Sequence, residues 1–483
     1  MRVCVVGSGG REHALADALA ATADVVVTPG NAGIPMSVPT PPEGVDADLF
    51  VIGPEAPLVD GLADRLRAAG RLVFGPGADG ARLEGSKAWM KDLLVEAGVP
   101  TAGHRAFTEV APAVNYLGTL SPPFVVKTDG LAAGKGVLVT GSRAEAADDV
   151  AAKLAGRSFG DAGRRVVVEE GLVGPEVSVL CVCDGTRAVP LAPAQDSKRL
   201  GDCDTGPNTG GMGAYSPVPV AGPAVVAEVV ERSVEPTLAA LRTRGIDYRG
   251  VLYAGVILTA DGPKVLEYNV RFGDPEAQVV LPRYRGDLAA LLAEAAAGRL
   301  RSEPSFADDA AVTVVLAAPG YPAAPRTGDP IRGVAEAAAV PGVRVYCAGV
   351  AAAMAPSHHH DPADAAPNGA YPPGRRSLGA ARSRSVDGAG RHGGADGRAG
   401  GAAVDDTSGP PLVTAGGRVL AVTAVAPGVA AARERAYQAV AKVRFPGMQY
   451  RTDIAAGAAD ARFDPQDPGP GSVRRSSERT AGS

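Results

Sequence analysis

Two hard oxygen donors stand close together near the middle of the sequence, in the stretch VLEYNVRFGDPE (265–276). Glu267 and Asn269 lie two apart on a predicted strand, so their side-chain oxygens face the same side. Mg²⁺ takes one or two such protein ligands beside substrate phosphates, and the pair is therefore predicted to hold Mg²⁺ or Mn²⁺ on the phosphates of ATP. Arg271 follows on the same face and could stabilise a transferring phosphoryl group or an acyl phosphate. An edge strand with alternating polar residues is the poorer alternative, because RFGDP (271–275) breaks the strand just after the pair.

A glycine-rich segment, VVKTDGLAAGKGVLV (125–139), carries two lysines. It is not a Walker A loop, because no Ser or Thr follows Lys135 and the next element reads as a strand. Such a hairpin can close over ATP phosphates as a lid, with Lys127, Gly134 and Lys135 contacting them. The alternative is a flexible hairpin whose lysines are solvated. Two lysines on either side of small residues favour the phosphate-binding lid over this alternative.

Three carboxylates mark a connection between strands in VVVEEGLVGPEVSV (166–179). Connections between domains commonly form the adenine slot, where a carboxylate can accept from ribose hydroxyls. Glu169, Glu170 and Glu176 are therefore candidates for adenosine binding. Taken alone, each would more often be a solvated surface charge.

The turn GSGGREH (7–13) follows the first strand. Glycines at this position let backbone N–H groups approach a phosphate at a helix N-terminus. A dinucleotide fingerprint is disfavoured, because Glu12 takes the place of its last glycine and TPG (28–30) follows the next strand in place of an acidic residue. A sugar phosphate at Gly9 and Gly10 and a tight turn without ligand remain equally open from this motif.

The stretch DTGPNTGGMGAYSP (204–217) has four glycines and two prolines among its residues. This composition predicts neither helix nor strand. A linker would be richer in Ser and charge, and the polar run AQDSKRLGDC (194–203) precedes it in an otherwise apolar chain. Backbone amides in NTGGMG are expected to wrap a small anionic group.

Strand and helix patterns place these motifs in several domains, as the length of 483 residues also suggests. Strands alternate with helices at the start, which predicts a parallel sheet. Later strands joined by Asp184-Gly185 and Asp261-Gly262 turns predict an antiparallel sheet. The expected division is an N-terminal α/β domain (1–85), a linker helix and lid (86–170), an antiparallel-sheet main domain (171–305), a small C-terminal α+β domain (306–454) with a low-complexity insertion (355–411), and a disordered tail (455–483).

Bulk composition excludes several classes. With 48 basic and 53 acidic residues, the net charge of −5 argues against a nucleic-acid or membrane-surface partner. The 46% hydrophobic and 21% charged content is ordinary for a globular enzyme. Five cysteines without disulfide or zinc spacing indicate a reducing cytoplasm. The polar residues in GSGGREH (7–13) predict that the N-terminus is not a signal peptide, and no apolar run in the sequence reaches transmembrane length.

Seven motifs appear in order: GGREHAL, PGNAG, GPEAPLVDG, LEGSKAWMKDLL, DGLAAGKGV, QDSKRLGDCDTGPNTGGMGAYSP and LEYNVRFGDPE. Together they strongly resemble the phosphoribosylamine–glycine ligase family, ATP-grasp enzymes of purine biosynthesis. The resemblance covers most of residues 1–454, and its most specific part is 195–217. It implies an ATP-grasp fold built from a small lid and a larger antiparallel-sheet domain.

The resemblance also implies a reaction and a set of roles. ATP would phosphorylate glycine to glycyl phosphate, and the amine of 5-phosphoribosylamine would attack it to form the amide, leaving ADP and phosphate. Arg271 and Lys198 would be catalytic, and Glu267 and Asn269 would hold the metal. The nucleotide would be bound by Lys127, Gly134, Lys135, Glu169, Glu170 and Glu176. The phosphoribosylamine pocket would involve Gly9, Gly10, Asn31, Gly53 and Glu55, and the glycyl end Asp196, Asn208, Gly210 and Gly211, with Arg199 adding charge.

Two departures from the family pattern leave rival interpretations open. Only residues 34–47 separate PGNAG from the strand DLFVI, where the family has a longer connection, and 355–411 interrupts the C-terminal domain. The rivals are another ATP-grasp carboxylate–amine ligase, and a nucleotide-binding homologue made inactive by the short connection. In each case small-molecule ligands and a monomer are expected.

Overall fold

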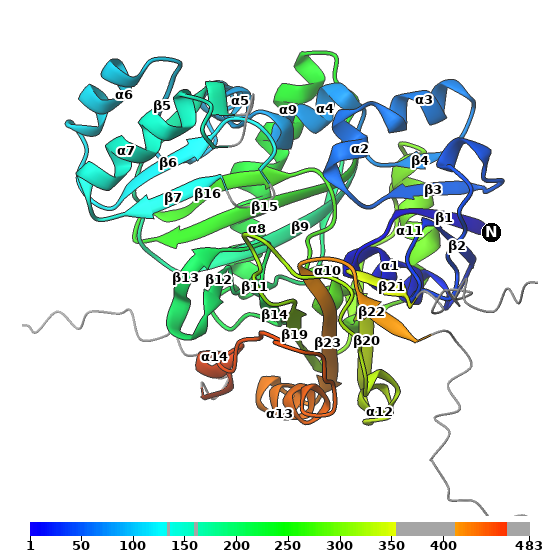
Figure 1. The fold of residues 1–483 in the computed structure, drawn as a ribbon. Helices are drawn as coiled ribbons and strands as arrows, with labels where there is room; N and C mark the ends of the chain where they lie inside the picture. Colours follow the sequence, from blue (N-terminus) through cyan, green and yellow to red (C-terminus); the bar gives the residue numbers. More distant parts are fainter. Residues whose placement is uncertain (133–135, 159–162, 354–410, 461–483) are drawn as a thin grey trace, which may run out of the picture. The chain divides into compact units, whose positions relative to one another are not determined.

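A computed structural model describes residues 1–132, 136–158, 163–353 and 411–460. The description below concerns the unit formed by residues 1–352 and 411–460 (Figure 1). The predicted insertion and most of the predicted tail lie outside the described residues.

The N-terminal segment forms the predicted parallel sheet, in the order β2-β1-β3-β4. Its Val-rich strands are buried because helices and neighbouring elements cover both faces. The short connection between β2 and β3 is packed: Ile34 and Val45 are buried, and Ser37 pairs with Val27. The strands are β1 (Arg2–Gly7), β2 (Asp24–Pro29), β3 (Leu49–Ile52) and β4 (Val73–Phe74), and the helices α1 (Gly10–Leu19), η1 (Pro42–Gly44), α2 (Glu55–Val59), α3 (Leu62–Ala68) and α4 (Ala78–Gly85).

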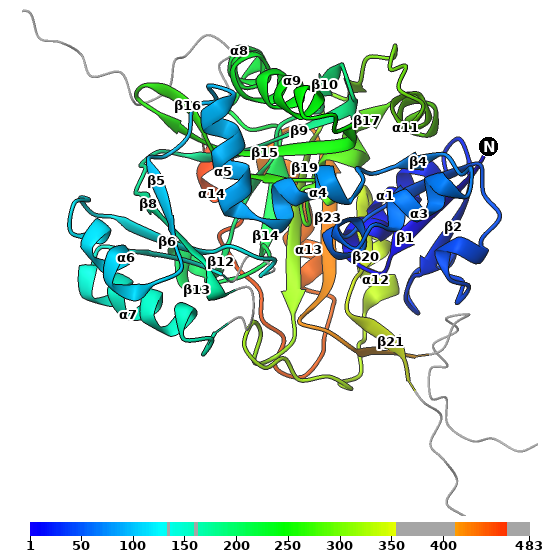
Figure 2. The ribbon, with the colours of Figure 1, turned by 90° about the horizontal axis from the view of Figure 1, so that it is seen from above.

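The lid follows helix α5 (Lys87–Glu96), whose N-terminus is capped by Ser86 accepting from the Trp89 N–H. Its sheet is antiparallel in the order β5-β8-β6-β7. Figure 2 shows α6 (Val110–Leu117) and α7 (Arg143–Leu154) on one face of this sheet. The strands are β5 (His104–Phe107), β6 (Phe124–Thr128), β7 (Val137–Thr140) and β8 (Val166–Glu170).

The main domain has the predicted antiparallel sheet, in the order β10-β9-β15-β16. The turns at Asp184-Gly185 and Asp261-Gly262 join neighbouring strands, as the sequence predicts. Its strands are β9 (Glu176–Asp184), β10 (Ala188–Pro190), β15 (Arg249–Thr259) and β16 (Gly262–Asn269). Its helices are α8 (Pro223–Val229), η4 (Val230–Val234), α9 (Glu235–Thr243), α10 (Ala277–Val280), η5 (Leu281–Arg283) and α11 (Leu288–Ala296), and β17 (Tyr284–Arg285) pairs with β18 (Ser305–Phe306).

The C-terminal sheet has the strand order β11-β14-β19-β23-β20. Its strands β11 and β14 come from the polar, glycine-rich region. Helices α12 (Val334–Ala338) and α13 (Val429–Val440) complete the domain. Residues 456–460, at the start of the tail expected to be disordered, form α14 (Ala456–Asp460) against α13. The strands are β11 (Gln195–Asp196), β14 (Gly213–Ser216), β19 (Ala310–Ala317), β20 (Val343–Cys347) and β23 (Arg418–Ala426), and β21 (Val350–Ala352) pairs with β22 (Leu412–Thr414).

The prediction that 204–217 contains no strand is wrong. Residues 205–208 form β13 (Thr205–Asn208), which pairs with β12 (Arg199–Gly201) across the turn η3 (Asp202–Asp204). Residues 213–216 form β14, paired with β19. Tertiary pairing overrides propensity here, and Gly213 is required because a Cβ would lie 2.7 Å from the Thr313 carbonyl oxygen.

Candidate active site

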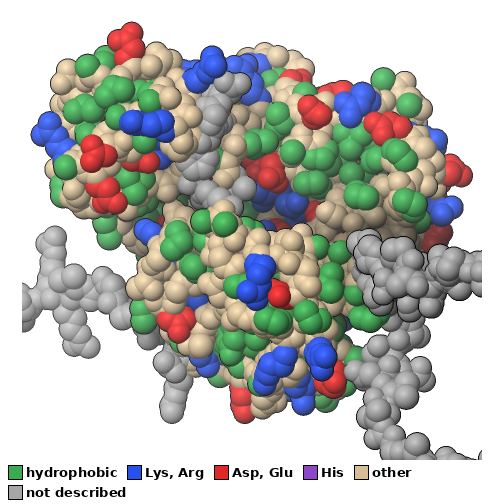
Figure 3. Space-filling model, in the orientation of Figure 1, with side chains coloured by type: hydrophobic (Ala, Val, Ile, Leu, Met, Phe, Trp, Pro, Cys, Tyr) green, Lys and Arg blue, Asp and Glu red, His purple; other side chains and the backbone are tan. Residues whose placement is uncertain are grey.

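Strand β16 carries Glu267 and Asn269 on one face, opposite the buried Tyr268. Burial alone would raise the pKa of Glu267, but nearby cations hold that pKa below its usual range. These cations are Lys87, Lys127, Lys198 and Arg271, in decreasing order of effect. Glu267 therefore stays ionised where positive charges from α5, β6, the polar run and the residues just after β16 converge. Figure 3 shows acidic and basic side chains gathered in the hollow at the centre of the displayed face.

Lys87 is a functional candidate that sequence reasoning missed. It stands at the first position of α5, directly after the capping Ser86. In the sequence it reads as an ordinary helix residue, and only the fold brings it near Glu267.

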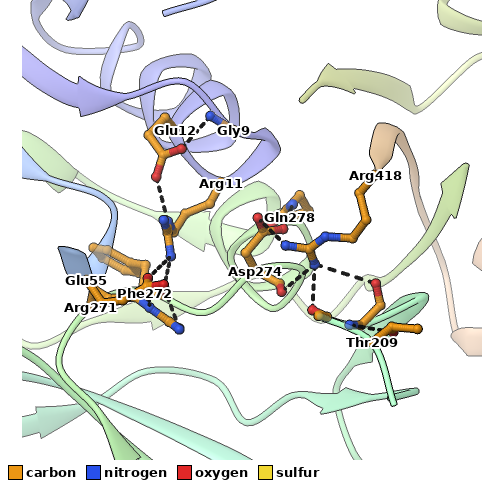
Figure 4. A network of polar contacts seen from close by, with 12 residues as sticks. Gly9, Arg11, Glu12, Glu55, Thr209, Arg271, Phe272, Asp274, Gln278 and Arg418 are labelled. Atoms are coloured by element: carbon orange, nitrogen blue, oxygen red, sulfur yellow. Dashed lines mark hydrogen bonds and ion pairs between the residues drawn. The ribbon is translucent and has the colours of Figure 1, made fainter. Parts of the chain in front are cut away.

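Arg271 lies just beyond β16 between two carboxylates of the N-terminal segment. Its Nε is 3.2 Å from Oε2 of Glu55, and its Nη2 is 2.8 Å from Oε1 of Glu84. Arg11 also approaches Glu55, at 4.0 Å, and donates to the Phe272 carbonyl oxygen at 3.2 Å (Figure 4). Burial opposes ionisation of Glu55, but Arg271 and Arg11 lower the pKa to about 2. Glu55 is thus an ionised partner of Arg271. Glu84 is a second partner of Arg271, which the sequence did not indicate.

Lys127 is the second-to-last residue of β6, at the base of the lid. Its Nζ lies 3.0 Å from Oε2 of Glu169 and donates to the Leu266 carbonyl oxygen at 3.0 Å. Lys91 of α5 lies 3.0 Å from the same Glu169 oxygen. Glu169 is 1% exposed, and its Oε1 is buried with no hydrogen-bond partner among the residues that the structure describes. Gly134 and Lys135 lie outside the described residues.

The three carboxylates of the predicted adenosine connection have different environments. Glu169 is in the buried ion pairs, and Glu170 accepts from the Gly103 N–H at 2.9 Å. Glu176 is 2.9 Å from Lys198 Nζ, which is also 2.7 Å from Oδ1 of Asp196. Lys198 is thus fixed beside two carboxylates, in the middle of the polar run.

Glu276 is a second candidate that the sequence did not single out. It is 3% exposed and accepts from the Tyr253 hydroxyl at 2.8 Å, and that hydroxyl also contacts Ser178 at 2.6 Å. Burial and the nearby Asp196 raise the pKa of Glu276 well above its usual range. An acidic pair therefore lies next to Lys198.

The glycine-rich loop does not offer its amides as an anion nest. The Gly210 N–H donates to the Tyr321 hydroxyl at 3.0 Å, and the Gly211 N–H to Thr209 Oγ1 at 3.0 Å. The N–H groups of Thr209 and Met212 donate to the carbonyl oxygens of Lys198 and Ser197. These amides are engaged within the protein because neighbouring segments supply acceptors, so the sequence-based prediction that they wrap an anion is wrong in this structure.

Arg418 of β23 fixes the loop to the turn after β16 (Figure 4). Its Nη1 donates to the carbonyl oxygens of Gly210 at 2.5 Å and Asp274 at 2.8 Å, and its Nη2 lies 2.8 Å from Oδ2 of Asp274. On the other side of the loop, Asn208 donates to the Val137 carbonyl oxygen of the lid at 3.1 Å. The loop is therefore tied to three parts of the chain.

The first turn is shaped by Glu12, which is 2% exposed. Its Oε2 accepts from the Gly9 N–H at 2.6 Å, and a Cβ on Gly53 would lie 2.1 Å from its Oε1. Gly10 lies against Gln278, whose Nε2 would be 3.0 Å from a Cβ there. The glycines at 9 and 53 are thus needed to accommodate Glu12 itself.

Asn31 connects this turn to the C-terminal domain. Its Nδ2 donates to the carbonyl oxygens of Ser8 at 2.8 Å and of Cys347 and Ala348 at 3.1 Å. Its Oδ1 accepts from the Gly33 N–H at 2.8 Å. The structure therefore gives the Asn31 side chain a bracing role, which the sequence did not predict.

Replacing Arg418 with Met is expected to lower kcat of the ADP-releasing reaction that the family resemblance implies by about 10- to 100-fold, because the loop and the turn lose their shared anchor. Nucleotide affinity should be unchanged, since Arg418 contacts neither Lys127 nor Glu169. Steady-state kinetics and calorimetry would measure both. Arg344→Met is the matched control, because Arg344 lies on the same sheet and pairs with Asp17 at the surface. Equal losses in the two variants would contradict the anchoring role.

No helix among the residues that the structure describes is long and apolar enough to cross a membrane.

Comparisons with known proteins agree along the chain. Sequence models of the phosphoribosylglycinamide synthetase N domain, ATP-grasp (A) domain and C domain match residues 1–84, 85–277 and 377–457. The N-domain match includes the short 34–47 connection. The phosphoribosylamine–glycine ligase of Streptomyces coelicolor is 46% identical, over 95% of this chain and 100% of its own length. That of Escherichia coli O6:H1 is 41% identical, over 94% of this chain and 98% of its own.

Solved structures give the same result. The phosphoribosylamine–glycine ligase of Thermotoga maritima superposes with a TM-score of 0.72 and 32% identity, covering 94% of this chain and all of that one. A biotin carboxylase of Campylobacter jejuni, at 13% identity and a TM-score of 0.61, shares the fold. The chain belongs to the phosphoribosylglycinamide synthetase family.

Proposed function

We propose that the protein is an ATP-dependent phosphoribosylamine–glycine ligase of purine biosynthesis. It joins glycine to 5-phosphoribosylamine through glycyl phosphate, giving 5-phosphoribosylglycinamide, ADP and phosphate. The observation that carries the proposal is the ionised Glu267, set beside Asn269 and surrounded by cations from separate segments. Close relatives named as this ligase support it over nearly the whole chain.

The residues present fit a divalent cation, because Glu267 offers an ionised oxygen and Asn269 an amide oxygen on the same strand face. We infer that these two residues hold Mg²⁺ or Mn²⁺ together with ATP phosphates. When bound, the cation supplies Lewis-acid stabilisation of charge on the phosphates. Lys87 and Lys127, which both lie near Glu267, would bind the phosphate oxygens. The sequence assigns the same role to Gly134 and Lys135.

Glu169 contributes to nucleotide binding through its unpartnered oxygen. Its Oε1 is a buried acceptor with no partner in the described part of the chain, and such groups are costly unless a ligand or water satisfies them. We infer that a donor of the adenosine supplies that hydrogen bond when the nucleotide is bound. Glu170 and Glu176 border the same connection.

The reaction then has two bond-making steps, and Arg271 acts on the acyl phosphate that links them. A glycine carboxylate oxygen attacks the γ-phosphorus of ATP, the bond to the bridging oxygen breaks, and ADP leaves. Arg271 and Lys198 stabilise the charge of the acyl phosphate. The amine of 5-phosphoribosylamine attacks the carbonyl carbon, phosphate leaves with the bonding electrons, and the nitrogen loses a proton. Gly9, Gly10, Asn31, Gly53 and Glu55 border the sugar-phosphate side, and Asp196, Asn208, Gly210 and Gly211 the glycyl side.

We place the protein in the cytoplasm as a monomer acting on small molecules. Cys4, Cys181, Cys183, Cys203 and Cys347 are all free thiols, and four of them are buried, which suits a reducing compartment. Sedimentation of the purified protein would test the monomer.

The activity is tested by ADP release from Mg-ATP and glycine, with and without phosphoribosylamine generated in place. Release that needs both substrates, with the glycinamide product identified by mass, is expected. Hydroxylamine in place of phosphoribosylamine should trap glycyl phosphate as the hydroxamate. Release dependent on a different acid or amine would favour another ligase, and nucleotide binding without turnover would favour an inactive homologue.

A further inference from the structure

A second lysine lies beneath Lys127 at the base of the lid, entirely out of solvent. Lys91 is 0% exposed, whereas the Lys127 side chain is 7% exposed. We propose that Lys91 is a positioning residue: it keeps Glu169 compensated, so that Lys127 can leave this carboxylate and bind the nucleotide phosphates. This inference rests on the proposed function of Lys127.

The two lysines share one oxygen. Each Nζ lies 3.0 Å from Oε2 of Glu169, which makes a buried triad of two cations and one anion. One cation is therefore surplus to the neutralisation of Glu169. If Lys127 moves to an ATP phosphate, the remaining Lys91–Glu169 pair is neutral. Without Lys91, the same movement would leave an unpaired buried carboxylate, which is strongly unfavourable.

The remaining contacts identify Lys91 as the stationary member. Its Nζ donates to Thr101 Oγ1 at 2.7 Å, and Thr101 donates in turn to the Val265 carbonyl oxygen of β16 at 2.6 Å. Lys127 instead donates to the Leu266 carbonyl oxygen, next to Glu267. Lys91 is thus anchored in the core between α5, β8 and β16, while Lys127 is directed to the proposed metal site.

The protonation of Lys91 gives a second signature. Burial, the largest cause, and Lys127 lower the pKa of Lys91 to about 8, against the opposing effect of Glu169 and the more distant Glu267. These are the charged groups that face it from β8, β6 and β16. Above about pH 8, Lys91 loses its charge, and Lys127 becomes the sole counter-ion of Glu169. Nucleotide affinity should therefore fall as the pH rises through this range.

The test measures the Kd of the magnesium complex of the β,γ-imido ATP analogue by calorimetry. Lys91→Met is expected to weaken binding by about tenfold or more. Glu169→Gln in the same chain should restore most of this loss, because a neutral amide no longer retains Lys127 and still offers an oxygen. Lys153→Met is the matched control: Lys153 is also buried, 2% exposed, but pairs with Asp149 on α7. Its affinity should equal that of the wild type.

A Lys91→Met variant that binds as tightly as the wild type, or a double variant no tighter than Lys91→Met, would overturn the proposal. If Lys91→Met does not fold, the pH profile decides: wild-type affinity should fall above about pH 8, and the Glu169→Gln profile should be flat there. If the affinities of the wild type and of Glu169→Gln change with pH in the same way, the proposal is overturned as well. Failure of the wild type to bind the analogue would instead contradict the proposed function itself.

Discussion

Replacing Glu267 with Gln is expected to lower kcat for ADP release by roughly 100- to 1000-fold, because the substitution removes the negative charge that Glu267 places among the nearby cations. The side chain keeps its size, so packing on β16 is preserved. Lys87 and Lys127 lose the anion that they surround, and the divalent cation loses an ionised ligand. The Mg²⁺ concentration needed for half-maximal activity should rise together with the loss in kcat.

ADP release measured over a series of Mg²⁺ concentrations would separate these effects. Asp261→Asn is the matched control, because Asp261 stands at the turn before β16 with its side chain 83% exposed. It should leave kcat and the Mg²⁺ requirement unchanged. If the Glu267 variant keeps normal kcat and Mg²⁺ dependence, Glu267 is not a metal ligand.

Gly211→Val is expected to lower kcat by about 100-fold, because small displacements of reacting groups are costly. Gly211 has φ of +106°, and a Cβ there would lie 2.5 Å from Pro275 Cδ. The turn that follows Arg271 must therefore shift. A side chain at such a backbone angle costs about 1–3 kcal/mol, so the protein should still fold. Nucleotide binding should be retained, since Lys127 and Glu169 contact other segments.

The kinetic assay and calorimetry with the ATP analogue would check this prediction. Gly222→Ala serves as the control, because a Cβ at Gly222 would meet nothing within 4 Å and its φ is −65°. Unchanged turnover in Gly211→Val would mean that the loop can be displaced without consequence. A parallel loss of nucleotide affinity would mean that the damage spreads beyond the loop.

The sequence predicts the parts of the site that lie on one element. Glu267 and Asn269 follow the two-residue period of a strand, and that period is readable without a structure. The parallel and antiparallel sheets were likewise predictable from alternating elements and turn residues. These features depend on local patterns, which a single sequence contains.

Partners from distant segments were not predictable. Glu84, Lys87 and Arg418 come from positions far from β16 in the chain, and no local pattern marks them. The same limit explains the error in 204–217. Its glycines and prolines argue against strands, but pairing with β12 and β19 decides the outcome. The backbone amides of the loop were predicted to bind an anion, but they donate to acceptors within the protein. Some of these acceptors, such as the Tyr321 hydroxyl, lie far away in the sequence, so the sequence does not show them.

The pairing of β21 with β22 has a practical consequence. Ala352 stands opposite Leu412 in this ribbon, so these two residues lie side by side. The entropy of closing a loop grows only with the logarithm of its length. The fold should therefore accept segments of very different length between these two residues. A reporter domain or an affinity tag inserted between these two residues is therefore expected to leave catalytic activity unchanged.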